Sequence, residues 1–171
     1  MTPQFPPPPD PIPLDPVVRK KVLRMIPYGM YVVTSRDNER IAAATIDWVS
    51  QASFEPPQVV CCLRQDSQIY DIVKRAKLYA LHPLGTGQKA FAANFFKNRE
   101  ASETHINGQL YRLGPHGVPL LTDAPAYLVL QMIGELTQGD HAVILGQIVA
   151  VELVRETAPL LLRDTGWNYG G

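Results

Sequence analysis

The sequence predicts a mainly β protein, a closed or nearly closed antiparallel barrel with peripheral helices. Many short apolar runs are separated by turn signals, and short helical patterns interrupt them without the regular strand-helix alternation of a parallel sheet. Two long runs, "AYLVLQMIGELT" and "HAVILGQIVAVEL", flank the tight turn "QGD" and form the clearest hairpin of the chain. The length of 171 residues suits one domain with its own core.

The first 14 residues are dominated by proline, which fixes φ and favours an extended conformation. We therefore expect an extended arm at 1–14 and a domain at 15–171. The arm is either a disordered tail or a segment that lies along a partner subunit. The next stretch, "DPVVRKKVLRMI", predicts a short amphipathic helix whose apolar face is formed by Val18, Val22, Met25 and Ile26.

The stretches "MYVVTSR" and "RIAAATI", separated by a turn at Asp37-Asn38, predict a β-hairpin that leads into "TIDWVSQASFEPP". That last stretch alternates polar and apolar side chains, which is typical of an extended strand. Its polar side faces either water, as in an ordinary half-buried strand, or a ligand. The polar residues are Thr45, Asp47, Gln51 and Ser53, and the apolar ones are Ile46, Trp48, Ala52 and Phe54.

The run "QVVCCL" after Pro56-Pro57 predicts another strand, and "DSQIYDIVKRA" predicts a helix with Asp66 or Ser67 as its N-cap. The strand "LYALHPL" and the helix "GQKAFAANFF", which ends near Phe96, follow. Polar residues and glycines then fill 97–118, where we expect a long irregular excursion with room for one short strand.

The charge balance and the cysteines narrow the class of protein. Sixteen basic and sixteen acidic residues give no net charge, which argues against a nucleic-acid or anionic-membrane surface. No apolar stretch has the length of a membrane span and no signal-peptide core is present, so we expect a soluble cytoplasmic protein. The neighbours Cys61 and Cys62 point to opposite faces of a strand, and we expect two buried structural thiols, with a reactive thiol as the alternative.

Several short motifs predict little chemistry. The "GTGQKA" stretch resembles a dinucleotide fingerprint, but no parallel βαβ unit follows, so we expect a helix-entry turn. The four histidines lack metal-ligand spacing, and we expect no metal site. Asp140 and His141 are adjacent without a nucleophile elbow, so they are either turn and strand residues or catalytic residues.

A phosphate site is suggested by "LRQDSQ", which carries a strand into a helix N-terminus with Arg64 and Ser67 at the junction. The alternative is a capping serine and a solvated arginine. If the strand ending near Ser53 pairs with "QVVCCLR", Ser53 and Arg64 could approach one phosphate, with the polar face of the preceding stretch extending away. FMN has a shape that matches this layout.

These segments together resemble the flavin reductase-like family of FMN-binding split barrels, flavoredoxin-like members included. The resemblance covers about Ile26 to Gly171 and includes "IPYGMYVVTS", "AAATIDWVSQASFEPPQVVCCLRQDSQIYDIV", "YALHPLGTGQKAFAANFF", "APAYLVLQMIGE", "GDHAVILGQIVAVEL" and "PLLLRDTGWNYGG". It implies an antiparallel FMN-binding split β-barrel and a homodimer with FMN near the subunit interface. It also implies hydride transfer from NADH or NADPH to the flavin.

The resemblance also implies site residues. His141 is similar to a histidine on the nicotinamide side of the flavin and is the expected catalytic residue, and Phe95 and Phe96 lie where the family has a helix end near the ring, unless they are core aromatics. The expected FMN-binding residues are Thr45, Ile46, Asp47 and Trp48 along the isoalloxazine, Gln51, Ala52 and Ser53 near the ribityl phosphate, Arg64 and Ser67 at the phosphate, and Phe96.

Many family members that reduce free flavin have small hydroxyl residues where this chain has "IDWVSQ", so Asp47 and Trp48 change the pocket. The leading expectation is an NAD(P)H-dependent flavin reductase, which could supply reduced FMN to a partner monooxygenase. The alternative is a flavoredoxin-like electron-transfer flavoprotein with tightly bound FMN and a protein redox partner. A barrel that has lost its flavin is the third possibility.

Overall fold

The structure is a computed structural model that describes residues 10, 12–38, 40–97 and 101–169. Most of the expected arm at 1–14 lies outside these ranges. Among the described residues, no helix has the length and apolar character that crossing a membrane requires.

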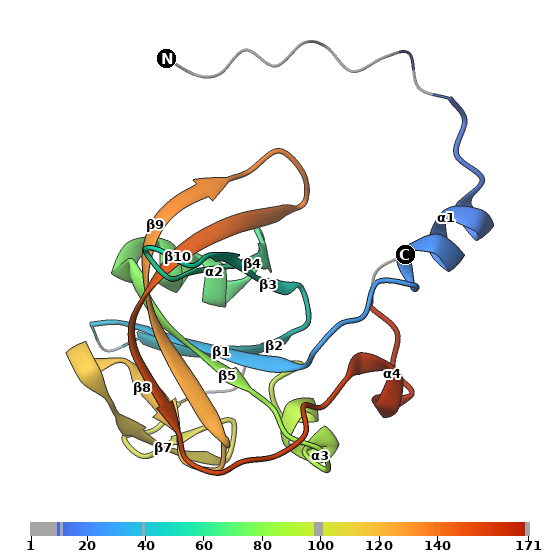
Figure 1. Ribbon diagram of the computed structural model, residues 1–171. Coiled ribbons are helices and arrows are strands. Elements are labelled where there is room, and N and C mark those ends of the chain that lie inside the picture. The colour runs from blue at the N-terminus through green and yellow to red at the C-terminus, as the bar shows by residue number, and fades with distance from the viewer. Residues whose placement is uncertain (1–9, 11, 39, 98–100, 170–171) are drawn as a thin grey trace, which may run out of the picture.

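The main element is a seven-stranded sheet in which all paired neighbours are antiparallel, as the sequence predicts (Figure 1). Its two edge strands follow each other in the chain. The order is β2 (Arg40–Ile46), β1 (Tyr31–Asp37), β5 (Leu78–Pro83), β9 (Ala126–Leu136), β10 (His141–Leu153), β4 (Gln58–Arg64) and β3 (Val49–Ser53).

The predicted alternation from Thr45 to Phe54 is not one strand. Strand β2 ends at Ile46 and β3 begins at Val49, so Asp47 and Trp48 form a link between the two sheet edges. The pleat therefore does not carry one polar face through the whole stretch, since side-chain alternation holds only within a continuous strand.

Helix α2 (Gln68–Ala76) begins as predicted, because Ser67 Oγ accepts a hydrogen bond from the Tyr70 backbone N–H. Its apolar side packs into the main core cluster between the helix and the inner face of the curled sheet. The buried helix residues are Ile69, Tyr70, Ile72 and Val73.

The three other α-helices in the described ranges are short and peripheral: α1 (Pro16–Leu23), α3 (Lys89–Ala93) and α4 (Leu162–Thr165). Asp15 caps α1 by accepting from the N–H groups of Val17 and Val18, but α1 buries no residue and stands away from the sheet (Figure 1). The "GTGQKA" stretch is the turn that enters α3. The preceding strand β5 has antiparallel neighbours, which excludes a βαβ dinucleotide site there.

The excursion expected at 97–118 contains more structure than predicted. Strands β6 (His105–Ile106), β7 (Gln109–Leu113) and β8 (Pro119–Leu121) form a second antiparallel sheet, with a short 3-10 turn at Pro115–Gly117. Asn107 and Gly108, with φ of 52° and 79°, make the tight turn between β6 and β7. An Asn-Gly pair is a strong hairpin signal. The sequence did not predict this hairpin because its strands are short and contain polar residues.

Candidate functional site

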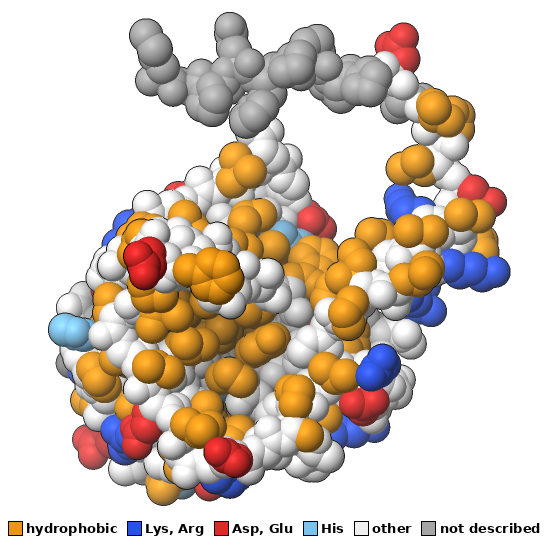
Figure 2. Space-filling view, in the orientation of Figure 1, with side chains coloured by type: hydrophobic (Ala, Val, Ile, Leu, Met, Phe, Trp, Pro, Cys, Tyr) orange, Lys and Arg blue, Asp and Glu red, His pale blue; other side chains and the backbone are white. Residues whose placement is uncertain are grey.

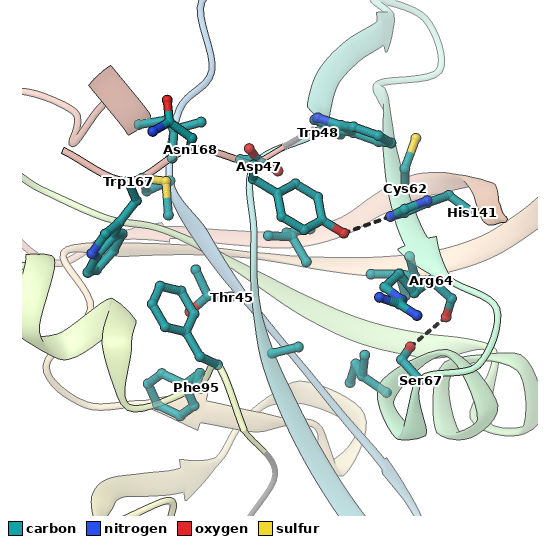
Figure 3. A pocket seen from close by; sticks show the side chains of 18 residues that line it. Thr45, Asp47, Trp48, Cys62, Arg64, Ser67, Phe95, His141, Trp167 and Asn168 are labelled. Carbon is teal, nitrogen blue, oxygen red and sulfur yellow. Dashed lines mark hydrogen bonds between the residues drawn. The ribbon is translucent and has the colours of Figure 1, made fainter. Parts of the chain in front are cut away.

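A cavity of about 570 Å³ opens where the end of β2, the 47–48 link, the end of β4, the start of β10 and the C-terminal segment meet (Figure 3). Its volume is within the range of small-molecule sites. Eight residues that the sequence analysis selected line this cavity: Thr45, Ile46, Asp47, Trp48, Arg64, Ser67, Phe96 and His141.

Three other selected residues, Gln51, Ala52 and Ser53, are not among the lining residues. Ser53 pairs with Gln58 at the start of β4, whereas Arg64 ends that strand. Six residue steps along a strand separate them by about 20 Å. The expectation that Ser53 and Arg64 approach one phosphate is therefore wrong for this chain.

Asp47 is a buried titratable group in the wall of the cavity. Its side chain belongs to a residue only 5% exposed, and its Oδ2 finds no hydrogen-bond partner among the described residues. Burial raises the pKa of Asp47 from 3.8 to about 6, although a backbone hydrogen bond and the nearby His141 act in the opposite direction. The fold thus holds a carboxyl in an environment that disfavours its charge.

Trp48 is the second residue of the link. Its indole Nε1 is buried and likewise lacks a partner within the described ranges. Its ring centroid lies 4.6 Å from that of His141 and 5.6 Å from that of Tyr169. An aromatic wall therefore encloses one side of the cavity.

His141 begins β10, directly after the turn, as the sequence predicts. Its Nδ1 lies 2.8 Å from Asp140 Oδ1, and its Nε2 lies 2.9 Å from the Tyr169 hydroxyl. Interaction with His141 lowers the pKa of Asp140. An ionised carboxylate only accepts, so His141 Nδ1–H donates to Asp140, and Nε2 faces the Tyr169 hydroxyl.

The corner at Arg64 and Ser67 is internally paired. The Arg64 guanidinium makes a two-pronged contact with Asp66, at 2.9 Å and 2.6 Å, and is exposed. Ser67 caps α2 and donates its hydroxyl to the Arg64 carbonyl at 2.7 Å. Ser67 is therefore the N-cap of α2, and both the α2 N-terminus and Arg64 border the cavity.

Thr45 is also engaged in structural bonds. Its hydroxyl donates to the Ala92 carbonyl at 2.7 Å and its backbone N–H donates to the Phe95 carbonyl at 3.3 Å, which joins β2 to the end of α3. Phe95 is 2% exposed and belongs to a core cluster, so it is a core aromatic that reaches the cavity. Phe96 is half exposed and its ring packs 4.7 Å from that of Trp167.

The C-terminal segment contributes residues that sequence reasoning did not assign. Trp167, Asn168 and Tyr169 line the cavity after Gly166, which has a φ of 73°. The two aromatic residues that follow Gly166 are a sequence feature from which a contribution to the cavity could have been predicted. The remaining unassigned lining residues are Met30, Ala44, Cys62, Leu63, Ile69 and Leu162.

The two cysteines differ. Cys61 is fully buried in the core, as expected, and burial raises the pKa of its thiol to about 12. Cys62 is only partly buried and lines the cavity, so it is not the second buried structural thiol that the sequence predicts. Within the described ranges, no three His, Cys, Asp or Glu side chains gather as metal ligands would.

Known proteins are similar to this chain over most of its length. The sequence model of the family described as "Flavin reductase like domain" matches residues 23–170. The chain is 28% identical to the ferric-chelate reductase (NAD(P)H) of Archaeoglobus fulgidus, over 81% of this chain and 83% of that protein. It is 26% identical to the NADH:FMN oxidoreductase of Rhodococcus qingshengii, covering 85% and 77%.

One further relative is a reductase component, and another is a longer protein. The reductase component of the FADH(2)-dependent resorcinol hydroxylase of a Rhizobium species is 25% identical, covering 85% of this chain and 82% of that protein. Diflavin flavoprotein A 1 of Synechocystis is 28% identical over 75% of this chain, which spans only 23% of that longer protein. A flavin reductase domain protein from Arthrobacter has a similar fold, with a TM-score of 0.75 at 22% identity, covering 85% and 89% of the two chains.

Proposed function

Because the chain belongs to the flavin reductase like domain family, we propose that it is an NAD(P)H-dependent flavin reductase that transfers hydride from NADH or NADPH to FMN. The observation that carries this proposal is the cavity beside the 47–48 link, which combines an aromatic wall with buried polar groups. The relative named ferric-chelate reductase (NAD(P)H) supports the donor, and the one named NADH:FMN oxidoreductase supports the donor and the cofactor.

The lining residues fit FMN in three respects. The volume suits a drug-sized ligand, and the aromatic side chains suit a flat ring. Two buried polar atoms lack partners among the residues that the structure describes, as expected where a ligand supplies them. The N-terminus of α2 and Arg64 provide amides and a cation for a phosphate.

In this proposal, the strand end and link from Thr45 to Trp48 hold the isoalloxazine within a split barrel that opens between β2 and β3. Arg64 exchanges Asp66 for the phosphate, and Ser67 contributes the helix N-terminus. Phe96 borders the ring. Gln51, Ala52 and Ser53 do not line the cavity, so a role for them near the ribityl phosphate requires that FMN extends beyond the cavity.

His141 acts on the nicotinamide side of the site. FMN supplies the hydride-accepting chemistry when bound, so the chain has to orient the donor and exclude water. Asp140 fixes the imidazole by accepting from Nδ1–H, which leaves Nε2 directed at Tyr169 and able to accept from a substrate donor once Tyr169 moves. His141 is therefore the catalytic residue of this proposal.

The test is oxidation of NADH and NADPH by the purified protein with added FMN. We expect turnover with at least one nucleotide, and His141→Ala to lower kcat/KM about 10- to 100-fold because the donor is no longer oriented. An unchanged rate in His141→Ala would remove this residue from the mechanism. No oxidation with either nucleotide, together with no flavin spectrum, would contradict the proposed function.

Assembly is part of the same proposal: a homodimer in the cytoplasm that passes reduced flavin to a partner monooxygenase. The reductase component among the relatives supports the partner. Exposed apolar side chains on β9 and β10 support the dimer. They include Ile133, Leu136, Val143, Val149, Val151 and Leu153. Figure 2 shows apolar side chains gathered on the face of the molecule that β10 crosses.

A further inference from the structure

Two buried polar atoms belong to consecutive residues that line the cavity. Asp47 Oδ2 and Trp48 Nε1 are closed off from solvent and have no hydrogen-bond partner in the part of the chain that the structure describes. An ionised carboxylate oxygen only accepts, and an indole N–H only donates. Native structures rarely leave such groups unpaired, so this pair suits a ligand that presents a donor beside an acceptor.

The surrounding side chains are already committed elsewhere. His141 uses Nδ1 for Asp140 and Nε2 for Tyr169, and its ring lies against Trp48. Tyr169 in turn lies 5.6 Å from the Trp48 ring, and so covers this wall of the cavity. While these contacts are made, neither His141 nor Tyr169 can hydrogen-bond with Asp47 Oδ2 or Trp48 Nε1.

We propose that the Asp47 carboxylate and the Trp48 indole N–H recognise the imide edge of the isoalloxazine, by accepting from N3–H and donating to the adjacent carbonyl. This inference rests on the proposed function, since it requires FMN in this cavity. The imide edge has one N–H between two carbonyl oxygens, which is the donor and acceptor order that the pair complements. Asp47 and Trp48 are thereby the specificity-determining residues for the flavin ring.

The placement of the pair agrees with the shape of FMN. Figure 3 shows Asp47 away from Ser67, which lies at the corner proposed for the phosphate. The imide and the phosphate are likewise at opposite ends of FMN. A nicotinamide carboxamide also pairs an N–H with a carbonyl, but hydride transfer requires the nicotinamide to stack on the face of the flavin, whereas the imide edge lies in the plane of the flavin ring.

Charge supports the same assignment. His141 lies close enough to favour the ionised form of Asp47, and the other titratable groups that interact with this carboxyl are Tyr28, Cys62 and Tyr169. With a pKa of about 6, Asp47 is mainly ionised at neutral pH and can accept from N3–H. A hydrogen bond to a charged acceptor is stronger than a neutral one, so loss of N3–H has a large effect on affinity.

The experiment compares FMN with N3-methyl-FMN, which lacks the N3–H donor, by quenching of flavin fluorescence on the full chain at pH 7.5. We expect the wild type to bind N3-methyl-FMN at least 10-fold more weakly than FMN. In Asp47→Ala, which removes the acceptor and makes room for the methyl group, the ratio of the two dissociation constants should fall below about 3. Trp48→Phe should weaken FMN binding severalfold.

Trp167→Phe is the matched control, because it is the same substitution in the same cavity at an indole that is not part of the pair; its ratio should equal that of the wild type. If Asp47→Ala does not fold, Asp47→Asn keeps the side-chain shape and should lower the ratio at least threefold.

Equal affinity of the wild type for both flavins would overturn the inference and leave the proposed function standing. A full wild-type ratio in a folded Asp47 variant would also overturn it, because the discrimination would then be steric. Failure of the wild type to bind FMN at all would overturn the proposed function and this inference together.

Discussion

At the scale of single residues, the buried carboxyl of Asp47 makes the stability of the fold depend on pH. Its carboxyl has a pKa of 3.8 in the ordinary state and about 6 in the fold, so the folded chain binds more protons between these values. The contribution of Asp47 to stability therefore falls as the pH rises from about 4 to about 6. Above pH 6 the full penalty of the buried charge remains.

Asp47→Asn should remove this penalty from the ligand-free protein. We expect its free energy of unfolding at pH 7.5 to exceed that of the wild type by about 1–2 kcal/mol, which is discounted for residual solvent screening. The difference should shrink towards zero near pH 4, where the wild-type carboxyl is protonated. Urea unfolding at both pH values measures it, and a difference independent of pH would contradict this account.

At the scale of elements, His82 joins the two sheets. It is fully buried in β5, donates from Nδ1 to the Val32 carbonyl of β1 at 3.0 Å, and accepts at Nε2 from the Leu121 N–H of β8 at 3.1 Å. Burial lowers the pKa of His82 from 6.5 to about 4. Its contribution is complete above pH 6.5 and is lost as the pH falls towards 4, because the unfolded chain binds the proton first.

His82→Ala should lower the free energy of unfolding by about 2–4 kcal/mol, since it leaves the Leu121 N–H without its acceptor and opens a cavity. The loss of stability between pH 6.5 and pH 4 should also become smaller in this variant. The exposed His105 gives a matched control, and His105→Ala should change stability by less than about 0.5 kcal/mol. Chemical unfolding across this pH range distinguishes the two variants.

At the scale of the whole molecule, the apolar outer face of β9 and β10 is the proposed dimer contact. Val151 is 68% exposed on β10, so a charge there does not disturb the core. Val151→Lys should weaken the dimer at least 10-fold, because it places a charge in a desolvated contact. Leu110→Lys, on the second sheet and 48% exposed, is the control.

Sedimentation equilibrium of the wild type and both variants measures the dimer constant. A monomeric wild type would remove the dimer from the proposal. A dimer that Val151→Lys leaves intact would move the contact to another face, such as the exposed helix α1.

The sequence by itself determined most strands of the seven-stranded sheet, the helix α2 with Asp66 or Ser67 as its cap, and the long hairpin of β9 and β10, because local periodicity and turn chemistry are sufficient to specify such elements. It also selected His141 and the stretch from Thr45 to Trp48 as cavity residues. The strand break at Asp47 and the second sheet escaped it, since a two-residue link and two- to five-residue strands are too short to show a period.

Only the tertiary structure determines which polar side chains lie close to one another. The antiparallel register places Ser53 at the opposite end of β4 from Arg64. The C-terminal segment folds back so that Tyr169 contacts His141, which is 28 positions earlier in the sequence. The tertiary structure also buries one polar atom each of Asp47 and Trp48 without a hydrogen-bond partner among the described residues. Register and burial depend on contacts between distant segments, and no local pattern of residues encodes them.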